Sequence, residues 1–340
     1  MTPSIAIVIP CRNEEKYILR CVESLLNSEY PKNKFDIYIC DGFSEDNTRK
    51  IVKELAINNS NIHLLDNPQR TTPYALNIGL KASSTEVKII LGAHAEVYSD
   101  FLKENINTLY ANPDAHCVGG IIENIYEDKI SKIIGMAMSS SFGVGNAHFR
   151  TGMKEGYVDT VAFGAYRSKV FDKVGYFDED LTRNQDDELN YRLIKNNLKI
   201  YLNNKIKSRY YVRGSFKKLV KQYKQYGYWK VYVNKKHKTV TTLRQTIPLL
   251  FFLFICSFIP VIQLDNIGII TKTYFIIFLI YLVLGFLFSF KKAGLSKDIL
   301  LVFYAFLLLH LSYGCGYFIG IIDFILLNKR PSISSEKLTR

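Results

Sequence analysis

Short apolar runs and amphipathic segments alternate along the first hundred residues. Four of these runs, rich in β-branched side chains, are typical of buried strands: residues 5–9, 35–40, 62–65 and 87–91. The segments between them place apolar residues on one face at helical spacing, as Ile18, Val22 and Leu25 do. This alternation of strand and helix predicts a doubly wound α/β sheet.

Polar loops follow three of the four predicted strands, directly after Ile9, Cys40 and Leu91. The carboxyl ends of parallel strands meet at one edge of a sheet, and ligands bind there in α/β folds of this kind. The sequence therefore predicts a binding site assembled from these loops.

The pattern becomes less regular beyond about residue 100. Residues 117–122 and 158–163 predict further strands, and residues 167–174 predict a short helix. Residues 139–150 are small, polar and rich in glycine, which predicts a loop or a lid. The pair Gly143-Val144-Gly145 lacks a third glycine and a leading strand, so it does not indicate a dinucleotide-binding turn.

Three long apolar segments end the chain, at residues 247–264, 267–290 and 299–327. Each is long enough to cross hydrocarbon, which takes roughly 18 to 20 residues. The loop at 264–266 has no basic residue and the loop at 291–297 has several, so the positive-inside rule places the N-terminal part on the cytoplasmic side. Three full spans would put the basic tail on the other side, and a bend in the third segment is the alternative.

The formal net charge of +13 comes from one segment, because residues 205–244 hold 13 Lys and Arg and no Asp or Glu. Aromatic residues, including the single tryptophan Trp229, alternate with these cations. Such a mixture beside apolar spans predicts contact with membrane lipids at the headgroup level. Nucleic-acid binding is the alternative, but no nucleic-acid module accompanies the charge, so no nucleic-acid partner is expected.

The cysteines and the N-terminus exclude two classes of protein. The six cysteines form no CxxC pair, and two of them lie in apolar segments, so neither a disulfide framework nor a zinc site is expected. The first residues lead directly into a strand, so no cleaved signal peptide is expected.

Three consecutive acidic residues, Asp186, Asp187 and Glu188, begin a predicted helix that runs toward Lys195. Like charges repel, so a folded protein keeps such a cluster where a cation, a proton transfer or the positive end of a helix uses it. A solvated acidic helix start is one interpretation. The polar loops and the apolar C-terminal segments favour a catalytic base.

Together and in this order, the motifs resemble the family 2 glycosyltransferases with the GT-A fold. The membrane-bound succinoglycan, or exopolysaccharide-type, transferases are the subgroup that they resemble most. The motifs are Val8-Ile9-Pro10-x-Arg12-Asn13-Glu14, Asp41-Gly42-x-Ser44-x-Asp46-x-Thr48, the stretch 184–192, Gln222 with Tyr226-Gly227-x-Trp229, and His310-x-x-Tyr313-Gly314-x-Gly316.

The resemblance implies an α/β architecture with a C-terminal membrane region. A GT-A catalytic domain, which is a Rossmann-like nucleotide-diphospho-sugar transferase domain, would cover 1–204. Amphipathic interface helices would lie in a basic and aromatic segment at 205–244. About three transmembrane segments would fill 245–328, and a basic tail would cover 329–340.

The resemblance also implies which residues hold the donor. The loops after the first two strands would bind the nucleotide through Pro10, Arg12, Asn13, Glu14 and Asp41. Asn77 matches a further nucleotide-side position, although a polar residue that packs a helix is the alternative.

Ser44 and Asp46 are better explained as residues that shape the turn before the next helix. Gln222 and Trp229 resemble the acceptor-side motif. Tyr228 stands where the family often has Arg, which weakens the expected contact with the diphosphate.

Asp186 matches the catalytic base of the family, because Arg192 follows at the sixth position, and Asp187 is the second candidate. An inverting transfer needs one carboxylate to take the proton of the acceptor hydroxyl as its oxygen attacks the anomeric carbon. The family metal motif, Asp-x-His in this subgroup, is here Gly92-Ala93-His94. His94 is therefore the predicted ligand of a divalent metal, Mn²⁺ or Mg²⁺. Weakened metal dependence or a purely structural His94 are the alternatives.

The implied function is inverting transfer of a sugar from a nucleotide diphosphate, with UDP favoured, onto a lipid-linked saccharide at the cytoplasmic membrane face. The expected context is surface polysaccharide synthesis at the inner membrane. Direct transfer onto polyprenyl phosphate is one alternative. A non-catalytic nucleotide-sugar-binding membrane scaffold is another, suggested by Gly92. A transporter and a processive synthase fit less well, because the apolar segments lack repeats and are few.

Overall fold

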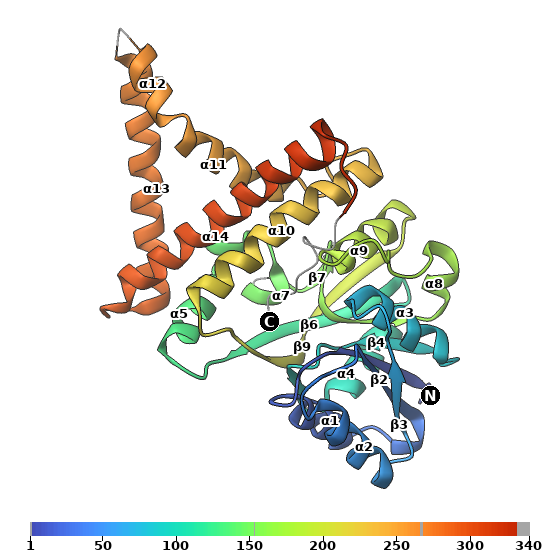
Figure 1. Cartoon of the computed structure of the whole chain (residues 1–340). Coiled ribbons are helices and arrows are strands. Elements are labelled where there is room, and N and C mark those ends of the chain that lie inside the picture. The colour runs from blue at the N-terminus through green and yellow to red at the C-terminus, as the bar shows by residue number, and fades with distance from the viewer. Residues whose placement is uncertain (1, 153, 266–267, 332–340) are drawn as a thin grey trace. The chain divides into compact units, whose positions relative to one another are not determined.

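The structure is a computed structural model that describes residues 2–152, 154–265 and 268–331 (Figure 1). Contacts within the chain divide it into two compact units. The first contains Met1–Ile125 and His148–Tyr211, and the second contains Tyr126–Ala147 and Val212–Arg340. Position 266 of the predicted loop and position 267 of the second predicted apolar segment lie outside the described residues. Residues 332–340 of the predicted basic tail do so too.

The first unit is built on a nine-stranded sheet in the order β3-β2-β1-β4-β8-β6-β9-β5, with β7 paired to β9. The four predicted strands are present and parallel: β1 (Ile5–Cys11), β2 (Phe35–Asp41), β3 (Ile62–Asp66) and β4 (Val87–Ile90). The side chains of β1 are buried on both faces of the sheet, which explains why its sequence is apolar without alternation.

The other strands extend the sheet beyond β4. They are β8 (Ala162–Arg167), antiparallel to β4, then β6 (Ala115–Ile125), β9 (Lys199–Tyr211), β5 (Ala95–Val97) and β7 (Gly156–Val158). Strand β9 was not expected, since 205–211 had been placed in the basic interfacial segment. The reason is its period of two: Ile206 and Ser208 are buried, whereas Lys205 and Arg209 are exposed.

Helices cover both faces of this sheet. On one face the apolar core includes residues of α1 (Ile18–Leu26), α2 (Thr48–Asn58) and α4 (Phe101–Ala111). On the other face it includes residues of α3 (Thr72–Ala82), α8 (Lys169–Val174) and α9 (Gln185–Lys195). The short helix α7 (His148–Thr151) lies against β6. This is the three-layer α/β arrangement that the sequence predicts.

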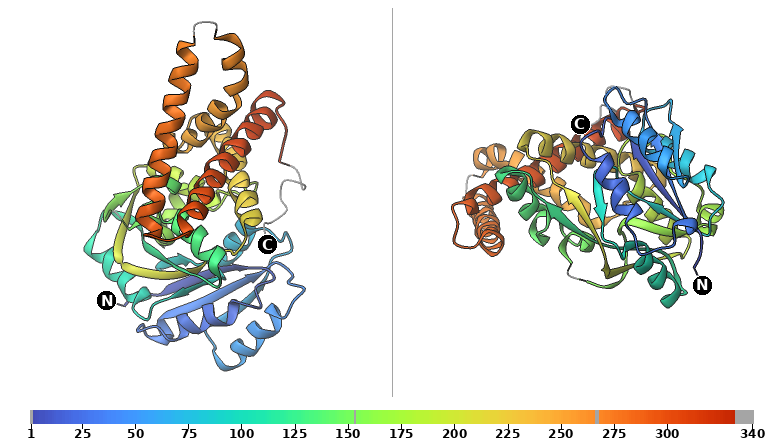
Figure 2. Two further views of the ribbon diagram at one scale, coloured as in Figure 1. Left: turned by 90° about the vertical axis from the view of Figure 1, so that its left-hand side faces the viewer. Right: turned by 90° about the horizontal axis from the view of Figure 1, so that it is seen from below.

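The second unit is helical. Its helices are α5 (Lys129–Met138), α6 (Ser141–Val144), α10 (Phe216–His237), α11 (Ile247–Cys256), α12 (Phe258–Leu264), α13 (Ile269–Ala293) and α14 (Asp298–Gly320), which continues as a π-helix over Ile321–Leu326. Helices α10 and α14 run side by side (Figure 1), and α12 lies beside α13 (Figure 2).

Glycines allow the backbones of α10 and α14 to approach closely. A Cβ atom on Gly227 would lie 2.0 Å from the carbonyl oxygen of Tyr313, and one on Gly316 would lie 1.9 Å from that of Lys224. Any side chain at these positions would therefore push the two helices apart. Small residues serve the same purpose where helices pack within membranes.

Among the residues that the structure describes, two helices are long and apolar enough to cross a membrane, Ile269–Ala293 and Asp298–Leu326. The first predicted segment is bent by 48° between Leu243–Cys256 and Phe258–Leu264, and it is a third candidate if this pair is one broken span. The third segment, for which a bend is the alternative, is one continuous candidate span over Asp298–Leu326, and the break lies in the first segment. Pro260 explains its place, because proline cannot donate to the carbonyl of Cys256 and clashes with it.

The predicted loop or lid at 139–150 is wrong in two places, because Ser141–Val144 form α6 and His148–Thr151 form α7. The ring of Phe142 packs against Phe288, Phe306 and His310. Its carbonyl oxygen lies 2.8 Å from His310 Nε2, and His310 Nδ1 lies 2.9 Å from the hydroxyl of Tyr281. A carbonyl can only accept, so Nε2 carries a hydrogen, and these bonds hold α6 against α13 and α14.

Candidate active site

The register of β1 and β2 brings two of the predicted loops together. Pro10 lies opposite Cys40, and Cys11 lies opposite Asp41, so the chain leaves both strands at the same level. The predicted donor-side residues at 10, 12, 13, 14 and 41 therefore gather at one edge of the sheet. This is the edge at which α/β sheets bind their ligands.

Hydrogen bonds tie these two loops to each other. Asn13, in the left-handed region with φ 54°, donates its backbone N–H to Ser44 Oγ at 2.8 Å, and its Oδ1 accepts from the N–H of Glu45 at 2.8 Å. The N–H of Glu14 donates to Thr48 Oγ1 at 2.7 Å. Because backbone groups of one loop bond to side chains of the other, neither loop can move independently.

Asp41 is fully buried and organises the second loop. Its Oδ1 accepts from Ser44 Oγ at 2.5 Å, and its Oδ2 accepts from the N–H of Ser44 at 3.0 Å and from Arg49 Nη1 at 2.8 Å. Arg49 also pairs with Asp66 at 2.8 Å. The sequence analysis missed Arg49, because an arginine in the first turn of an amphipathic helix carries no signal of its own.

Ser44 and Asp46 shape the turn, as their positions predict. Asp46 accepts from the N–H of Thr48 at 3.0 Å and from that of Glu15 at 3.1 Å. Burial acts to raise the pKa of Asp46, but the hydrogen bonds from Thr48 and Glu15 outweigh it and hold the pKa below its usual range. The carboxylate is therefore a fixed part of the loop.

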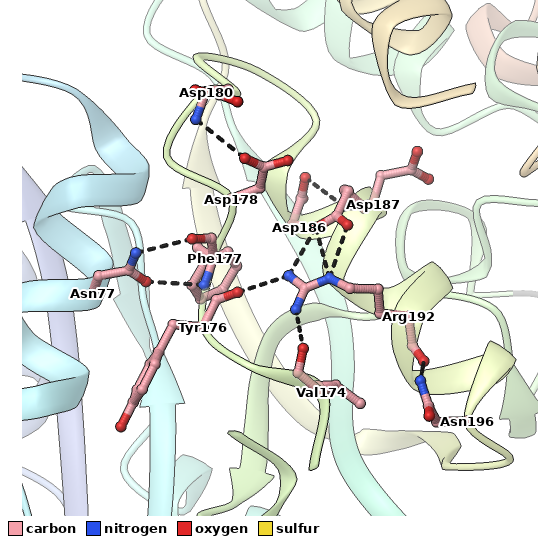
Figure 3. Close-up of polar contacts among 11 residues, drawn as sticks. Asn77, Val174, Tyr176, Phe177, Asp178, Asp180, Asp186, Asp187, Arg192 and Asn196 are labelled. Atoms are coloured by element: carbon pink, nitrogen blue, oxygen red, sulfur yellow. Dashed lines mark hydrogen bonds and ion pairs between the residues drawn. The ribbon is translucent and has the colours of Figure 1, made fainter. Parts of the chain in front are cut away.

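Asn77 uses its whole side-chain amide to hold another loop (Figure 3). Its Oδ1 accepts from the N–H of Phe177 at 2.9 Å, and its Nδ2 donates to the carbonyl of Phe177 at 2.9 Å and to Glu179 at 2.8 Å. These bonds attach the loop before α9 to α3. They favour the packing interpretation of Asn77 over a contact with the nucleotide.

The acidic cluster forms the first turn of α9, after Asn184 in the left-handed conformation with φ 60°. Asp186 is exposed, and its Oδ1 accepts from the N–H of Asp187 at 2.9 Å. Burial raises the pKa of Tyr166 on β8, and the nearby charges of Cys117 and Asp186 raise it further. The exposed carboxylate of Asp186 is accessible to a substrate hydroxyl.

Arg192 clamps the helix that carries Asp186 (Figure 3). Its guanidinium donates to both carboxylate oxygens of the buried Glu188, with Nε at 2.8 Å from Oε1 and Nη2 at 2.8 Å from Oε2. It also donates to the carbonyls of Val174 and Tyr176, the latter at 2.8 Å. Glu188 thus has a structural partner, and Asp186 and Asp187 are the candidates for base.

At the predicted metal position, the ring of His94 lies 4.9 Å from that of Tyr210. The nearby Glu96 accepts a hydrogen bond from the hydroxyl of Tyr211. A Cβ on Gly92 would meet His94 Cε1 at 3.5 Å, an ordinary contact, so no steric demand requires glycine. Within the described part of the chain no three His, Cys, Asp or Glu residues group as metal ligands. His94 alone does not make a ligand set.

Gln222 and Trp229, predicted on the acceptor side, lie on α10 in the second unit. Gln222 accepts from Arg213 at 3.2 Å and donates to the hydroxyl of Tyr226 at 2.7 Å. Trp229 is fully buried, with its ring against Tyr232 and Phe324. The tryptophan is therefore a packing residue of this unit and does not lie at the lipid headgroups.

Comparison with known proteins decides the family. The model of the family described as "Glycosyl transferase family 2" matches residues 6–175. The chain belongs to glycosyltransferase family 2. The predicted enzyme class and GT-A fold are thereby confirmed.

Two curated relatives match most of this glycosyltransferase. The dolichyl N-acetyl-alpha-D-glucosaminyl phosphate 3-beta-D-2,3-diacetamido-2,3-dideoxy-beta-D-glucuronosyltransferase of Methanococcus voltae is 40% identical over 231 residues, which is 66% of this chain and 71% of the relative. The succinoglycan biosynthesis protein ExoA of Rhizobium meliloti is 31% identical over 248 residues, 72% of this chain and 74% of the relative. The resemblance to succinoglycan-type transferases is confirmed.

A solved structure shares the fold of this glycosyltransferase at low sequence identity. The mannosyltransferase PcManGT of Pyrobaculum calidifontis, in complex with GDP-Man and Mn²⁺, has a TM-score of 0.59 and 14% identity, and the match covers 94% of this chain and 88% of that one. At this identity the likeness shows the GT-A fold alone. It agrees with the nine-stranded sheet and its two helical layers.

Proposed function

We propose that this family 2 glycosyltransferase is an inverting enzyme that transfers a sugar from a nucleotide diphosphate to a lipid-linked saccharide. Two relatives support the acceptor class, since one is named for a dolichyl-linked N-acetylglucosamine phosphate acceptor and the other for succinoglycan synthesis. UDP is the nucleotide we propose from the family resemblance. A structure of similar fold holds GDP-Man, so the fold by itself does not select the nucleobase of the donor.

Asp186 is the proposed base, and its place carries the proposal. It stands exposed in the first turn of α9, a helix fixed by Arg192 and Glu188. The N-terminus of a helix favours the ionised carboxylate, which a base requires. Asp186 takes the proton of the acceptor hydroxyl. At the same time the oxygen of that hydroxyl bonds to the anomeric carbon from the face opposite the leaving group. The bond from that carbon to the diphosphate breaks, so the configuration inverts.

The donor would bind at the edge formed by β1 and β2. Pro10 lies near the end of β1, and Arg12, Asn13 and Glu14 lie on the loop that the hydrogen bonds to Ser44 and Thr48 hold in one shape. A loop fixed before binding loses little conformational entropy when the nucleotide arrives. Asp41 is proposed to set the shape of this site.

Two further parts of the predicted site concern the acceptor and the metal. We propose that Gln222 and Trp229 position the acceptor side indirectly, because both are buried within the helical unit. His94 is the one protein ligand that we propose for Mn²⁺ or Mg²⁺, with diphosphate oxygens and water as the rest. When bound, such a cation would offset charge on the diphosphate.

We propose that the first unit is the catalytic part, on the cytoplasmic face of the inner membrane, and that α13 and α14 anchor the chain. Their length and composition and the basic loop at 291–297 support this orientation. A lipid product that carries one sugar only would instead favour direct transfer onto polyprenyl phosphate. Donor binding without turnover would favour the scaffold.

The test is a screen of nucleotide sugars with the purified full chain, with and without Mn²⁺, followed by nucleotide release and by the lipid product. With the donor and acceptor that react in this screen, Asp186→Asn should lower turnover by about 10²- to 10⁴-fold, the usual contribution of a general base. Nucleotide binding should be kept. Asp172→Asn, at an exposed aspartate in the first turn of α8, is the control and should keep full turnover. Full turnover in Asp186→Asn would refute the assignment of Asp186 as the catalytic base.

A further inference from the structure

Three side-chain polar atoms of α7 are buried without a hydrogen-bond partner among the residues that the structure describes. They are His148 Nδ1, Arg150 Nη1 and Thr151 Oγ1. An unmet buried donor or acceptor costs about 1 to 3 kcal/mol, and more when it is charged. Such atoms are rare in native proteins, and a group of them within one turn indicates that water or a ligand meets them.

A chain of ring contacts leads from this turn to the predicted metal position. The guanidinium of Arg150 lies 5.8 Å from the ring centre of Tyr210, and that ring lies 4.9 Å from the ring of His94. His94 and Phe163 in turn lie equally near the position of Gly92, each 3.5 Å from a Cβ atom placed there. All five residues belong to the first unit, so their arrangement is internal to one compact body.

Two features of this path favour a negatively charged ligand. The family carries a carboxylate where this chain has Gly92, so that position has lost a negative charge. Arg150 adds a fixed positive charge, because a guanidinium stays protonated in proteins. Both differences make the surroundings of Tyr210 and His94 better suited to an anion.

We propose that Arg150 binds the diphosphate of the sugar donor and offsets the charge that grows on it as the sugar leaves. This inference rests on the proposed function. When the bond between the anomeric carbon and the diphosphate breaks, its electron pair stays on the terminal phosphate oxygen. A guanidinium suits that group, because its N–H donors match two phosphate oxygens at once. His148, on the same turn, would add a second polar contact.

The experiment measures binding of UDP and of uridine to the detergent-solubilised full chain, in EDTA and again in Mn²⁺. Arg150→Met should weaken UDP binding about ten- to a hundredfold in EDTA, the usual effect of losing a charged hydrogen bond, and should leave uridine binding unchanged. Arg150→Lys should recover part of the loss. Arg209→Met is the matched control, since Arg209 precedes Tyr210 on the same strand but lies over the ring of Tyr98 at 4.5 Å.

Each other result counts against a specific statement. If Arg150→Met binds UDP as tightly as the wild-type chain and the Arg209→Met control, the inference is overturned. Water then supplies the hydrogen bonds of the buried atoms of α7. If Arg150→Met loses UDP and uridine equally, the residue is structural, and the inference is again overturned. If the wild-type chain binds none of UDP, GDP and dTDP, the proposed donor class fails, which is a different outcome from either of these.

Discussion

The first unit is fixed at its functional positions by polar side chains, whereas the second is fixed by the close approach of backbones. In the sheet unit, Arg49 joins Asp41 to Asp66, and Arg192 joins Glu188 to two carbonyls. In the helical unit, Gly227 and Gly316 let α10 and α14 touch. The comparison teaches that the first unit is sensitive to the loss of a charge, and the second to the gain of volume.

The surroundings of each unit explain this difference. Loops at the edge of a sheet must satisfy their own backbone groups, and ionised side chains do this with several hydrogen bonds at once. In the helical unit α14 is long and apolar enough to cross a membrane, and a helix in lipid gains little by hiding apolar surface from surroundings that are themselves apolar. Close contact between backbones is then the main source of attraction.

The largest effect on stability is expected for Arg192→Met in the first unit. Glu188, which is 2% exposed, would remain charged and buried without its partner, and breaking such a pair usually costs about 3 to 5 kcal/mol. Thermal unfolding and turnover should both fall. Lys199→Met is the control, because Lys199 and its partner Asp114 are exposed, and no measurable change is expected. Equal effects of the two substitutions would contradict the clamp.

An intermediate effect is expected for Gly227→Leu in the second unit. The new side chain would meet the carbonyl of Tyr313, and overpacking of this kind costs about 3 kcal/mol. Gly227→Ala should give a smaller loss of thermal stability in detergent. Lys221→Leu adds a leucine at an exposed position of the same helix and serves as the control. If Gly227→Leu is as stable as that control, the helices do not touch as described.

The smallest effect on stability, within about 0.5 kcal/mol, is expected for Gly92→Asp, because its Cβ would meet only ordinary contacts. The substitution restores the Asp-x-His pair of the family, so it should tighten Mn²⁺ binding, which spin resonance of the metal can measure. Gly92→Asn has a similar shape and no charge and should tighten it less. Unchanged Mn²⁺ binding in Gly92→Asp would show that His94 is not placed to share a metal.

The parts of the fold that depend on local pattern could be predicted from the sequence. The strands β1 to β4 are continuous apolar runs, and their order fixes which loops meet. The acidic start of α9 also follows from its composition. Glu188 lies one helical turn before Arg192, so that pair is visible in the sequence. The remaining contacts of the two clamps could not be predicted, because Asp66 lies 17 residues from Arg49 and Tyr176 accepts through its backbone carbonyl.

The basic segment shows why composition misled the prediction. Its first residues alternate buried and exposed side chains and therefore form β9, whose cations lie on the exposed side. Its tryptophan lies in a helix that packs tightly on α14, so Trp229 is buried. Charge counts do not distinguish these cases, whereas the period of the apolar residues does. Arg150 was missed for another reason, because its neighbours Tyr210 and His94 are far away in the chain.

The assignment of Tyr126–Ala147 to the helical unit has a consequence for synthesis of the chain. The apolar side chains of α5, such as Ile133 and Ile134, are made long before α14, against which this helix packs. About 160 residues separate them, so at roughly 5 to 20 residues per second the ribosome needs about 8 to 32 seconds to supply the partner. During that interval a chaperone or the membrane itself has to shield this helix, and a chain cut after Tyr211 would never bury it.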